Sequence, residues 1–359
     1  MRAVKSDGLS VKLLTDAPEP APAPGEALVK VSRVLVSPAD AAMAASSGAT
    51  KPSPESGGTR AFSGIIGGQM VGTVRKINMP ADAPPTLAAR KNWVGKRVVA
   101  GPNIACGACD LCRGGLATHC RSRKVMGSWE RDGCMAEWCA LPLASLCAVP
   151  DSVSDDLASL AVPLSSALHA ANMLRAESSA YITVLGDSLL ALLTAQTLAR
   201  MNKSVRVLSA RPDRMRLCEK WGIKHRPIDE AGRRQDQDVV VDCTGSSQGL
   251  RLALQFVRPR GIILLKAGPA LAPMPAGRPL PEVDAHSAWG RPLDLTIAAV
   301  NEVQIIGSRD GPIPDALRML SDNALDALPL ITRRFPLSEA MSALAAAISP
   351  DHIGVLIEV

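Results

Sequence analysis

Four cysteines stand close together in the stretch IACGACDLCRGGLATHC, residues 104–120. They are Cys106, Cys109, Cys112 and Cys120. Gly107, Gly114 and Gly115 give the intervening backbone the freedom to fold around one ion. Zinc takes four thiolates in a tetrahedron at roughly 2.3 Å, and four protein ligands leave no position for substrate. The spacing predicts a structural zinc site, although an iron–sulfur cluster uses the same ligands.

The remaining cysteines lie in apolar surroundings, where they are expected to be core thiols. They are Cys134, Cys139, Cys147, Cys218 and Cys243. The N-terminal segment MRAVKSDGLSVKLL has no apolar signal region, and no run of eighteen apolar residues occurs. Nine cysteines in such a chain favour metal binding over disulfides. We therefore expect a cytoplasmic protein that does not enter a membrane.

Length and composition indicate a globular protein of two domains. The chain has 359 residues, of which 47% are hydrophobic and 3% aromatic, and a formal charge of +6. Its basic residues are dispersed among acidic ones, and few aromatic rings exist to stack nucleic-acid bases. These features argue against a nucleic-acid partner and favour a small-molecule substrate.

Hydrophobic patterning changes at about residue 155. Before it, short β-rich segments alternate with Gly and Pro; the stretch 44–60 reads as a loop. After it, a helix is expected near 152–176, followed by alternating strands and helices from AYITVLG through GIILLKAG. This alternation predicts an α/β fold with a doubly wound parallel sheet. The proline-rich stretch 269–292 is expected to be an insertion or an extended loop.

The cysteine segment CGACDLCRGGLATHC resembles the structural-zinc lobe of the zinc-containing alcohol dehydrogenases, in the medium-chain dehydrogenase/reductase superfamily. Further matches follow in family order: PAPGEALVKV (22–31), VGKRVVAGP (94–102), DGCMAEWCALP (132–142) and VPDSVSDDLASLAVPLSSALHA (149–170). The resemblance implies a β-rich GroES-like domain at 1–155, completed by about 305–359, and a Rossmann dinucleotide-binding domain at 156–304. It also implies a homodimer or homotetramer.

The turn VLGDSLLALL, residues 184–193, is the predicted pyrophosphate-binding turn. Against the pattern G-x-G-x-x-G it offers Gly186, Ser188 and Ala191. Alanine is common at the third position, whereas Ser188 adds a side chain where backbone should approach phosphate. The serine hydroxyl could bind phosphate instead, or the site could be weakened.

The end of the second strand, VRVLSARPDR, should select between NAD and NADP. It offers Ser209 and Arg211 in place of an acidic residue, which suits a 2′-phosphate and favours NADP over NAD. Alternatively, Arg211 only begins an exposed helix. The segment DCTG should lie near the cofactor ribose. The predicted cofactor-binding residues are Gly186, Asp187, Ser188, Leu190, Ala191, Ser209, Arg211, Thr244 and Gly245.

The resemblance also implies a second, catalytic zinc, and its ligands are missing. In VLVSPAD, Ser37 stands at the cysteine position and Ala39 replaces the proton-relay hydroxyl. In GIIGGQMVGTV, Gly68 stands at the histidine position, and Val162 occupies that of the glutamate. Glycine and valine offer no ligand atom, and serine is a poor zinc ligand. The catalytic residues therefore remain unassigned.

A second resemblance favours an enzyme that needs no catalytic zinc. VSPAD is similar to the V-N-P-x-D segment of zinc-independent quinone and enone reductases of the same superfamily, although these commonly lack a four-cysteine lobe. Tyr181, the only tyrosine, is not placed to donate a proton. We expect an NAD(P)H-dependent oxidoreductase with one structural zinc, acting on a carbonyl, alcohol or enone. The alternatives are a catalytically degenerate binding or assembly module and a conventional zinc alcohol dehydrogenase.

Overall fold

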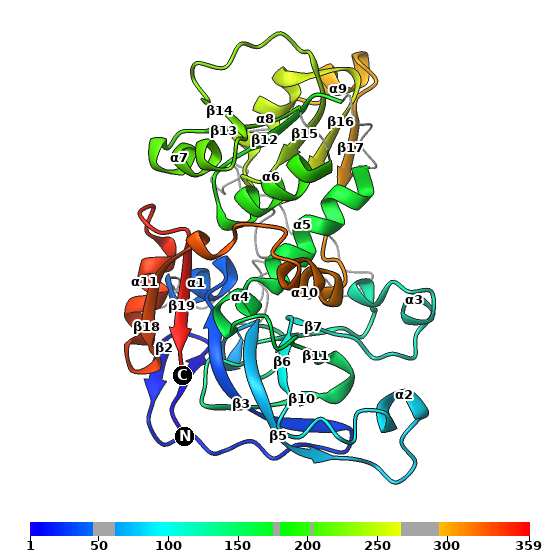
Figure 1. Cartoon of the computed structure of the whole chain (residues 1–359), viewed down its shortest axis with the longest axis vertical. Helices are drawn as coiled ribbons and strands as arrows, with labels where there is room; N and C mark the ends of the chain where they lie inside the picture. Colours follow the sequence, from blue (N-terminus) through cyan, green and yellow to red (C-terminus); the bar gives the residue numbers. More distant parts are fainter. Residues whose placement is uncertain (46–61, 175–179, 202–203, 267–293) are drawn as a thin grey trace. The chain divides into compact units, whose positions relative to one another are not determined.

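The computed structural model describes residues 1–45, 62–174, 180–201, 204–266 and 294–359 (Figure 1). Most of the predicted loop at 44–60 and the whole stretch 269–292 lie outside these ranges. The chain divides into two compact units. The first contains Met1–Val162 and Ile313–Val359, and the second contains the described residues between them. Within the described ranges, every helix is too short or too polar to cross a bilayer.

The first unit is built on a seven-stranded sheet. Its order is β11 (Cys147–Ala148), β6 (Arg97–Ala100), β5 (Met70–Asn78), β3 (Glu26–Leu35), β19 (Gly354–Glu358) and β18 (Ile331–Pro336), and β10 (Trp138–Pro142) also pairs with β3. All pairs are antiparallel except β18 with β19. Because β19 pairs with β3, the C-terminal segment completes this sheet. Val29, Val31 and Val34 of β3 are fully buried in the core of the unit.

Two small sheets and six α-helices surround this sheet. The small sheets are β2 (Val11–Leu14), β1 (Ala3–Asp7) and β4 (Ser63–Ile65), and β7 (Asn103–Ile104), β8 (Lys124–Met126) and β9 (Glu130–Arg131). The helices are α1 (Pro38–Ala45), α2 (Pro85–Ala88), α3 (Asp110–Arg113), α4 (Asp155–Ser159), α10 (Ile313–Ser321) and α11 (Ala340–Ile348). Helix α4 begins where Ser154 accepts a hydrogen bond from the Leu157 N–H at 3.3 Å.

The second unit contains a six-stranded parallel sheet. Its order is β14 (Lys224–Pro227), β13 (Val205–Ser209), β12 (Ile182–Leu185), β15 (Gln237–Asp242), β16 (Val257–Leu265) and β17 (Gln304–Gly307). The sheet runs outward in both directions from β12, which is the topology of a doubly wound dinucleotide-binding fold. Every residue of β12 is fully buried, as a strand covered on both faces requires. The predicted α/β fold class is confirmed.

Helices follow most strands of this sheet. They are α5 (Ala161–Leu174), which precedes β12, α6 (Leu189–Met201), α7 (Pro212–Lys220), α8 (Ser247–Phe256) and α9 (Thr296–Val300). Residues 228–236, which connect β14 with β15, contain no helix. The sequence did not predict β14 or β17. Both are four residues long and half-exposed, so neither shows the apolar pattern of a buried strand.

Candidate functional site

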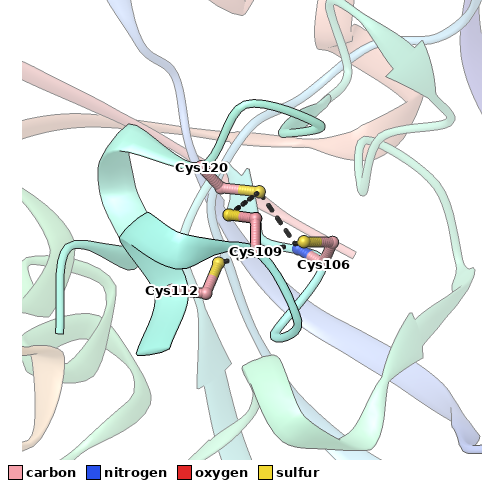
Figure 2. A group of neighbouring side chains, drawn as sticks. All are labelled: Cys106, Cys109, Cys112 and Cys120. Atoms are coloured by element: carbon pink, nitrogen blue, oxygen red, sulfur yellow. Dashed lines mark hydrogen bonds between the residues drawn. The ribbon is translucent and has the colours of Figure 1, made fainter. Parts of the chain in front are cut away.

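The structure brings the four predicted zinc ligands together. Cys106 lies before helix α3, Cys109 and Cys112 lie at and within it, and Cys120 follows the 3₁₀ turn Ala117–His119. Figure 2 shows the four side chains turned toward one another. The backbone of Gly107 and of Gly115 has φ of +74° and +79°, values that favour glycine. Gly114 has a negative φ of −80°, so its conformation does not require glycine.

The spacing of the sulfur atoms fits one tetrahedral ion. All four Sγ atoms lie within 4.8 Å of one another. The Sγ atoms of Cys106 and Cys112 are 4.0 Å apart, and those of Cys109 and Cys120 are 3.9 Å apart. A zinc–sulfur distance of about 2.3 Å in a tetrahedron implies sulfur atoms about 3.8 Å apart. The donor set therefore fits zinc and leaves no position for a substrate.

Backbone N–H groups direct positive charge at the sulfurs. The N–H of Ala108 donates to the Cys106 Sγ at 3.4 Å, and the N–H of Cys106 donates to the Cys120 Sγ at 3.3 Å. The N–H groups of Cys112 and Arg121 lower the pKa of Cys109 to about 6. Burial, and then the neighbouring Cys109, raise the pKa of Cys112 to about 12. A bound cation would favour the thiolate form of all four.

The positions that correspond to a catalytic zinc site also lie near one another in the first unit. A β-carbon built at Gly68 would lie 3.4 Å from the Pro102 Cβ, and one built at Gly101 would lie 3.6 Å from the Val162 Cγ2. Gly68 and Val162 thus both lie against the segment Gly101–Pro102. Across the described ranges, the cysteine lobe is the only group of three or more His, Cys, Asp or Glu side chains arranged to hold a metal.

Asp40 organises the neighbouring turn. This carboxylate is 2% exposed and accepts hydrogen bonds from the Ser37 hydroxyl at 2.6 Å and from the Ser37 N–H at 2.9 Å. Its second oxygen accepts a hydrogen bond from the Gly67 N–H at 3.2 Å. Gln69 is also buried, and its amide donates to the Leu35 carbonyl at 3.3 Å. The polar side chains here satisfy backbone groups and each other rather than an ion.

The predicted phosphate turn follows the carboxyl end of β12. Gly186 has φ of +102°, a conformation that favours glycine, and the turn packs against Cys243 and Thr244 after β15. The Ser188 hydroxyl accepts a hydrogen bond from the Ala191 N–H at 3.3 Å and caps helix α6. This cap gives a structural reason for serine at the middle glycine position. Leu190 and Ala191 lie in the first turn of the same helix.

At the end of β13, Ser209 is bonded to the turn after β12. Its hydroxyl donates to the Asp187 carboxylate at 2.5 Å and accepts from the Arg211 N–H at 2.9 Å. Arg211 and Arg214 both lie beside Asp213, at 3.8 Å and 3.0 Å. Burial, and then the proximity of Arg211, lower the pKa of Arg214. The end of β13 therefore carries two guanidinium groups where an acidic residue is typical of NAD specificity.

Asp242 was included in the sequence prediction only as the first residue of the segment DCTG, and Lys266 was not predicted. Asp242, at the end of β15, accepts hydrogen bonds from the Thr244 N–H and hydroxyl at 2.9 Å and 2.7 Å, and Gly245 follows with φ of +65°. Lys266, directly after β16, is 6% exposed and donates to the Ser308 hydroxyl at 3.1 Å and to the Arg309 carbonyl. Burial lowers the pKa of Lys266 to about 8. The sequence feature that could have identified Lys266 is its position directly after the apolar strand β16.

The predicted cofactor residues therefore meet at one edge of the second unit's sheet. They follow the carboxyl ends of β12, β13 and β15, the edge at which open parallel sheets bind ligands. The bond between Asp187 and Ser209, and the packing of Gly186 against Thr244, join these three loops. Their role in binding a cofactor stays a prediction.

Comparison with known proteins agrees with this architecture. Residues 23–151 match the alcohol dehydrogenase GroES-like domain. A zinc-type alcohol dehydrogenase-like protein of Haemophilus influenzae is 27% identical over 261 residues, covering 69% of this chain and 71% of the relative. An L-idonate 5-dehydrogenase of Vitis vinifera is 27% identical over 295 residues, covering 77% and 73%.

Solved structures share the fold over the whole chain. A protein described as a zinc-binding dehydrogenase from Sinorhizobium meliloti 1021, bound to NADP, superposes with a TM-score of 0.78 at 21% identity and covers 100% of this chain and 99% of its own. The chain is thus a two-domain protein with a GroES-like domain and a Rossmann domain. The GroES-like match and the curated relatives make it similar to the alcohol dehydrogenase-like proteins of the medium-chain dehydrogenase/reductase superfamily.

Proposed function

We propose that the chain is an NAD(P)H-dependent oxidoreductase that reduces a small carbonyl compound or enone, or oxidises the corresponding alcohol, without a catalytic zinc. A bound reduced nicotinamide supplies hydride to the substrate carbon, and the substrate oxygen or enolate takes up a proton. The supporting observation is that, within the described ranges of the chain, no set of metal ligands gathers at Ser37, Gly68 and Val162. A carbonyl there must be held by hydrogen bonds.

We further propose that the four-cysteine lobe holds one structural zinc. The sulfur spacing and the N–H groups directed at the sulfurs support this assignment. All four ligands come from the chain, so the ion stabilises the loop 104–120 and takes no part in the reaction.

The end of β13 supports a preference for NADPH over NADH. Arg211 and Arg214 supply positive charge beside Ser209, while the nearby carboxylate of Asp187 is bonded to the Ser209 hydroxyl. Arginine binds phosphate through paired, charge-assisted hydrogen bonds. The N-terminus of helix α6, after Gly186, would face the pyrophosphate.

Titration of the purified full chain with NADPH and with NADH tests this proposal, followed by assays on quinones and enones. We expect NADPH to bind at least about tenfold more tightly than NADH, a ratio typical of one charge-assisted contact. Arg211→Gln should reduce that ratio, whereas Arg216→Gln, at an exposed position of the same helix, should not. If neither nicotinamide binds, the chain is not an NAD(P)H-dependent enzyme.

A second candidate function is a non-catalytic binding or assembly module. The observation that favours it is the combined loss of the ligand positions and of the relay hydroxyl at Ala39. This function predicts no turnover and a stable partner present in stoichiometric amount. Robust turnover of the isolated chain, as a homodimer or homotetramer, would exclude it.

A further inference from the structure

A cavity of about 710 Å³ lies at the other edge of the second unit's sheet. Arg206 and Lys224, at the beginnings of β13 and β14, line it, and so does Asp236, directly before β15. The strands are parallel, so their beginnings share one edge and their ends share the other. The cavity is therefore distinct from the edge that carries Gly186 and Ser209.

The connection between β14 and β15 explains why a cavity exists here. Residues 228–236 contain no helix, whereas α6, α7 and α8 follow the other strands of this part of the sheet. A loop thus takes the place of a crossover helix, and its residues Gly232 and Arg234 line the cavity.

Cations are concentrated around this cavity. Strand register places Arg206 opposite Lys224 and Leu208 opposite Arg226, so the three cations lie on one face of the sheet. Four cations and two carboxylates line the cavity: Arg206, Lys224, Arg226 and Arg234, with Glu219 and Asp236. Among the residues that the structure describes, no ion pair within 4.0 Å joins these cations to a carboxylate. The cavity therefore has an excess of positive charge.

A buried chain of hydrogen bonds fixes the Arg206 side chain. The Arg206 Nε donates to the Thr183 hydroxyl at 2.8 Å, which donates to the Gln237 carbonyl oxygen at 2.7 Å. The Gln237 amide in turn donates to the Asp236 carboxylate at 2.6 Å. Thr183 and Gln237 are buried. The orientation of the guanidinium is thus set by the fold and not by a ligand.

One N–H group of the Arg206 guanidinium makes no hydrogen bond to the described residues. Its Nη2 is buried and has no hydrogen-bond partner within the described part of the chain. Burial, opposed by Asp236 and reinforced by Arg226, lowers the pKa of Arg206. A buried donor without an acceptor is costly, and such groups commonly mark an absent ion or water. The Arg206 guanidinium also lies over the buried Phe256 ring, 5.9 Å from its centroid, and an oxyanion in the cavity would balance the positive charge.

We propose that this cavity binds a small phosphorylated molecule, with Arg206, Lys224 and Arg226 contacting its phosphate oxygens. Arginine matches phosphate geometry better than it matches a diffuse charge. The volume suits a small metabolite, and the described residues of the cavity lining include no Phe, Tyr or Trp, which argues for recognition mainly through charge. The cations surround a cavity and do not form a stripe, which disfavours nucleic acid.

Calorimetric titration of the full chain with inorganic pyrophosphate tests this site, with NADPH present at saturation to block the turn after β12. We expect one saturable site per chain. The double variant Lys224→Gln/Arg226→Gln should bind at least tenfold more weakly, and Arg206→Gln should show a similar loss. The matched control Arg75→Gln/Lys76→Gln removes two exposed cations from β5 in the other unit and should bind like the unaltered chain.

Three results would overturn the proposed phosphate site. Lys224 and Arg226 are exposed, so their double variant should fold even if Arg206→Gln does not. Unchanged binding by the double variant would overturn the site, as would no saturable binding of pyrophosphate to the unaltered chain. Tight binding of a short DNA duplex that pyrophosphate cannot displace would also overturn it. Should NADPH itself fail to bind, the titration without NADPH and the same variants give the answer independently.

Discussion

The four-cysteine lobe and the surroundings of Ser37, Gly68 and Val162 belong to the same unit but have opposite chemistry. In the lobe, four sulfurs lie within 4.8 Å of one another. In the second region, a hydroxyl, a hydrogen and an isopropyl group stand at the corresponding ligand positions. In the loop 104–120 only Ile104 and Cys120 are buried, so the loop has little core of its own and a metal can supply its folding energy. The second region is stabilised by the sheet, and Asp40 bonds its turn together without a metal.

On the proposed assignment, the chain carries the ligand set of a structural metal site and lacks that of a catalytic one. Removing a structural metal would leave four thiols without a fold to hold them. Removing a catalytic metal leaves a polar cavity that side-chain hydrogen bonds can satisfy.

The largest effect is expected for Cys109→Ser. One weaker ligand should release the zinc, and the chain should lose on the order of 5 kcal/mol of stability because metal binding is coupled to folding of the lobe. Zinc analysis and urea unfolding measure both quantities. Cys147→Ser, at a half-buried cysteine outside the cluster, is the control and should retain its zinc. Equal zinc content in the two variants would contradict a four-cysteine site.

Restoring the missing ligands should add a second ion. The triple variant Ser37→Cys/Gly68→His/Val162→Glu restores all three ligand types, and Gly68 and Val162 both approach the segment Gly101–Pro102. A β-carbon at Gly68 meets only ordinary contacts, so histidine can be accommodated there. We expect zinc to rise from one toward two ions per chain. A content that stays at one in the folded variant would show that these positions no longer converge.

Asp40→Ala should destabilise the turn that the second region depends on. The change removes the acceptor of the Ser37 and Gly67 N–H groups, and buried donors without acceptors cost about 3 kcal/mol together. Urea unfolding gives the loss. Asp40→Asn, which keeps one acceptor oxygen, should lose less. A change below about 0.5 kcal/mol for Asp40→Ala would mean that the turn does not rely on this carboxylate.

The smallest effect concerns Lys266, and it depends on pH. Since burial lowers the pKa of Lys266 to about 8 from 10.5, the unfolded chain holds this proton more tightly than the folded chain between those values. The contribution of Lys266 to the free energy of unfolding should therefore rise with pH in that window, by up to about 3 kcal/mol at its upper limit, against a fall contributed by buried thiols whose pKa values burial raises. The increase should be absent from Lys266→Met. The exposed control Lys76→Met should keep it, and a rise that persists in Lys266→Met would assign the effect to another group.

Sequence patterns predicted those parts of the fold that carry strong local signals. The buried strand β12, helix α6 and the strand β15 are continuous apolar segments whose type follows from length and periodicity. Strands β14 and β17 lack such a pattern, because edge strands are defined by pairing with a neighbour and not by burial. Their existence depends on contacts between distant residues, which one sequence does not display.

The candidate sites also combine features that local sequence predicts with features that depend on distant contacts. The cysteine lobe follows from residue type and spacing alone, since its ligands are close in sequence. The Ser188 cap and the bond between Asp187 and Ser209 depend on loops that meet only in the folded chain. Lys266 was missed because its burial depends on the segment at Ser308 and Arg309, about forty residues further along.

We propose that this chain holds one zinc ion in the four-cysteine lobe and none at the positions of Ser37, Gly68 and Val162. The most direct test is elemental analysis of zinc in the purified full chain, expressed per polypeptide after exhaustive dialysis against zinc-free buffer. We expect one zinc ion per chain. Two ions per chain would contradict it and indicate a catalytic zinc alcohol dehydrogenase.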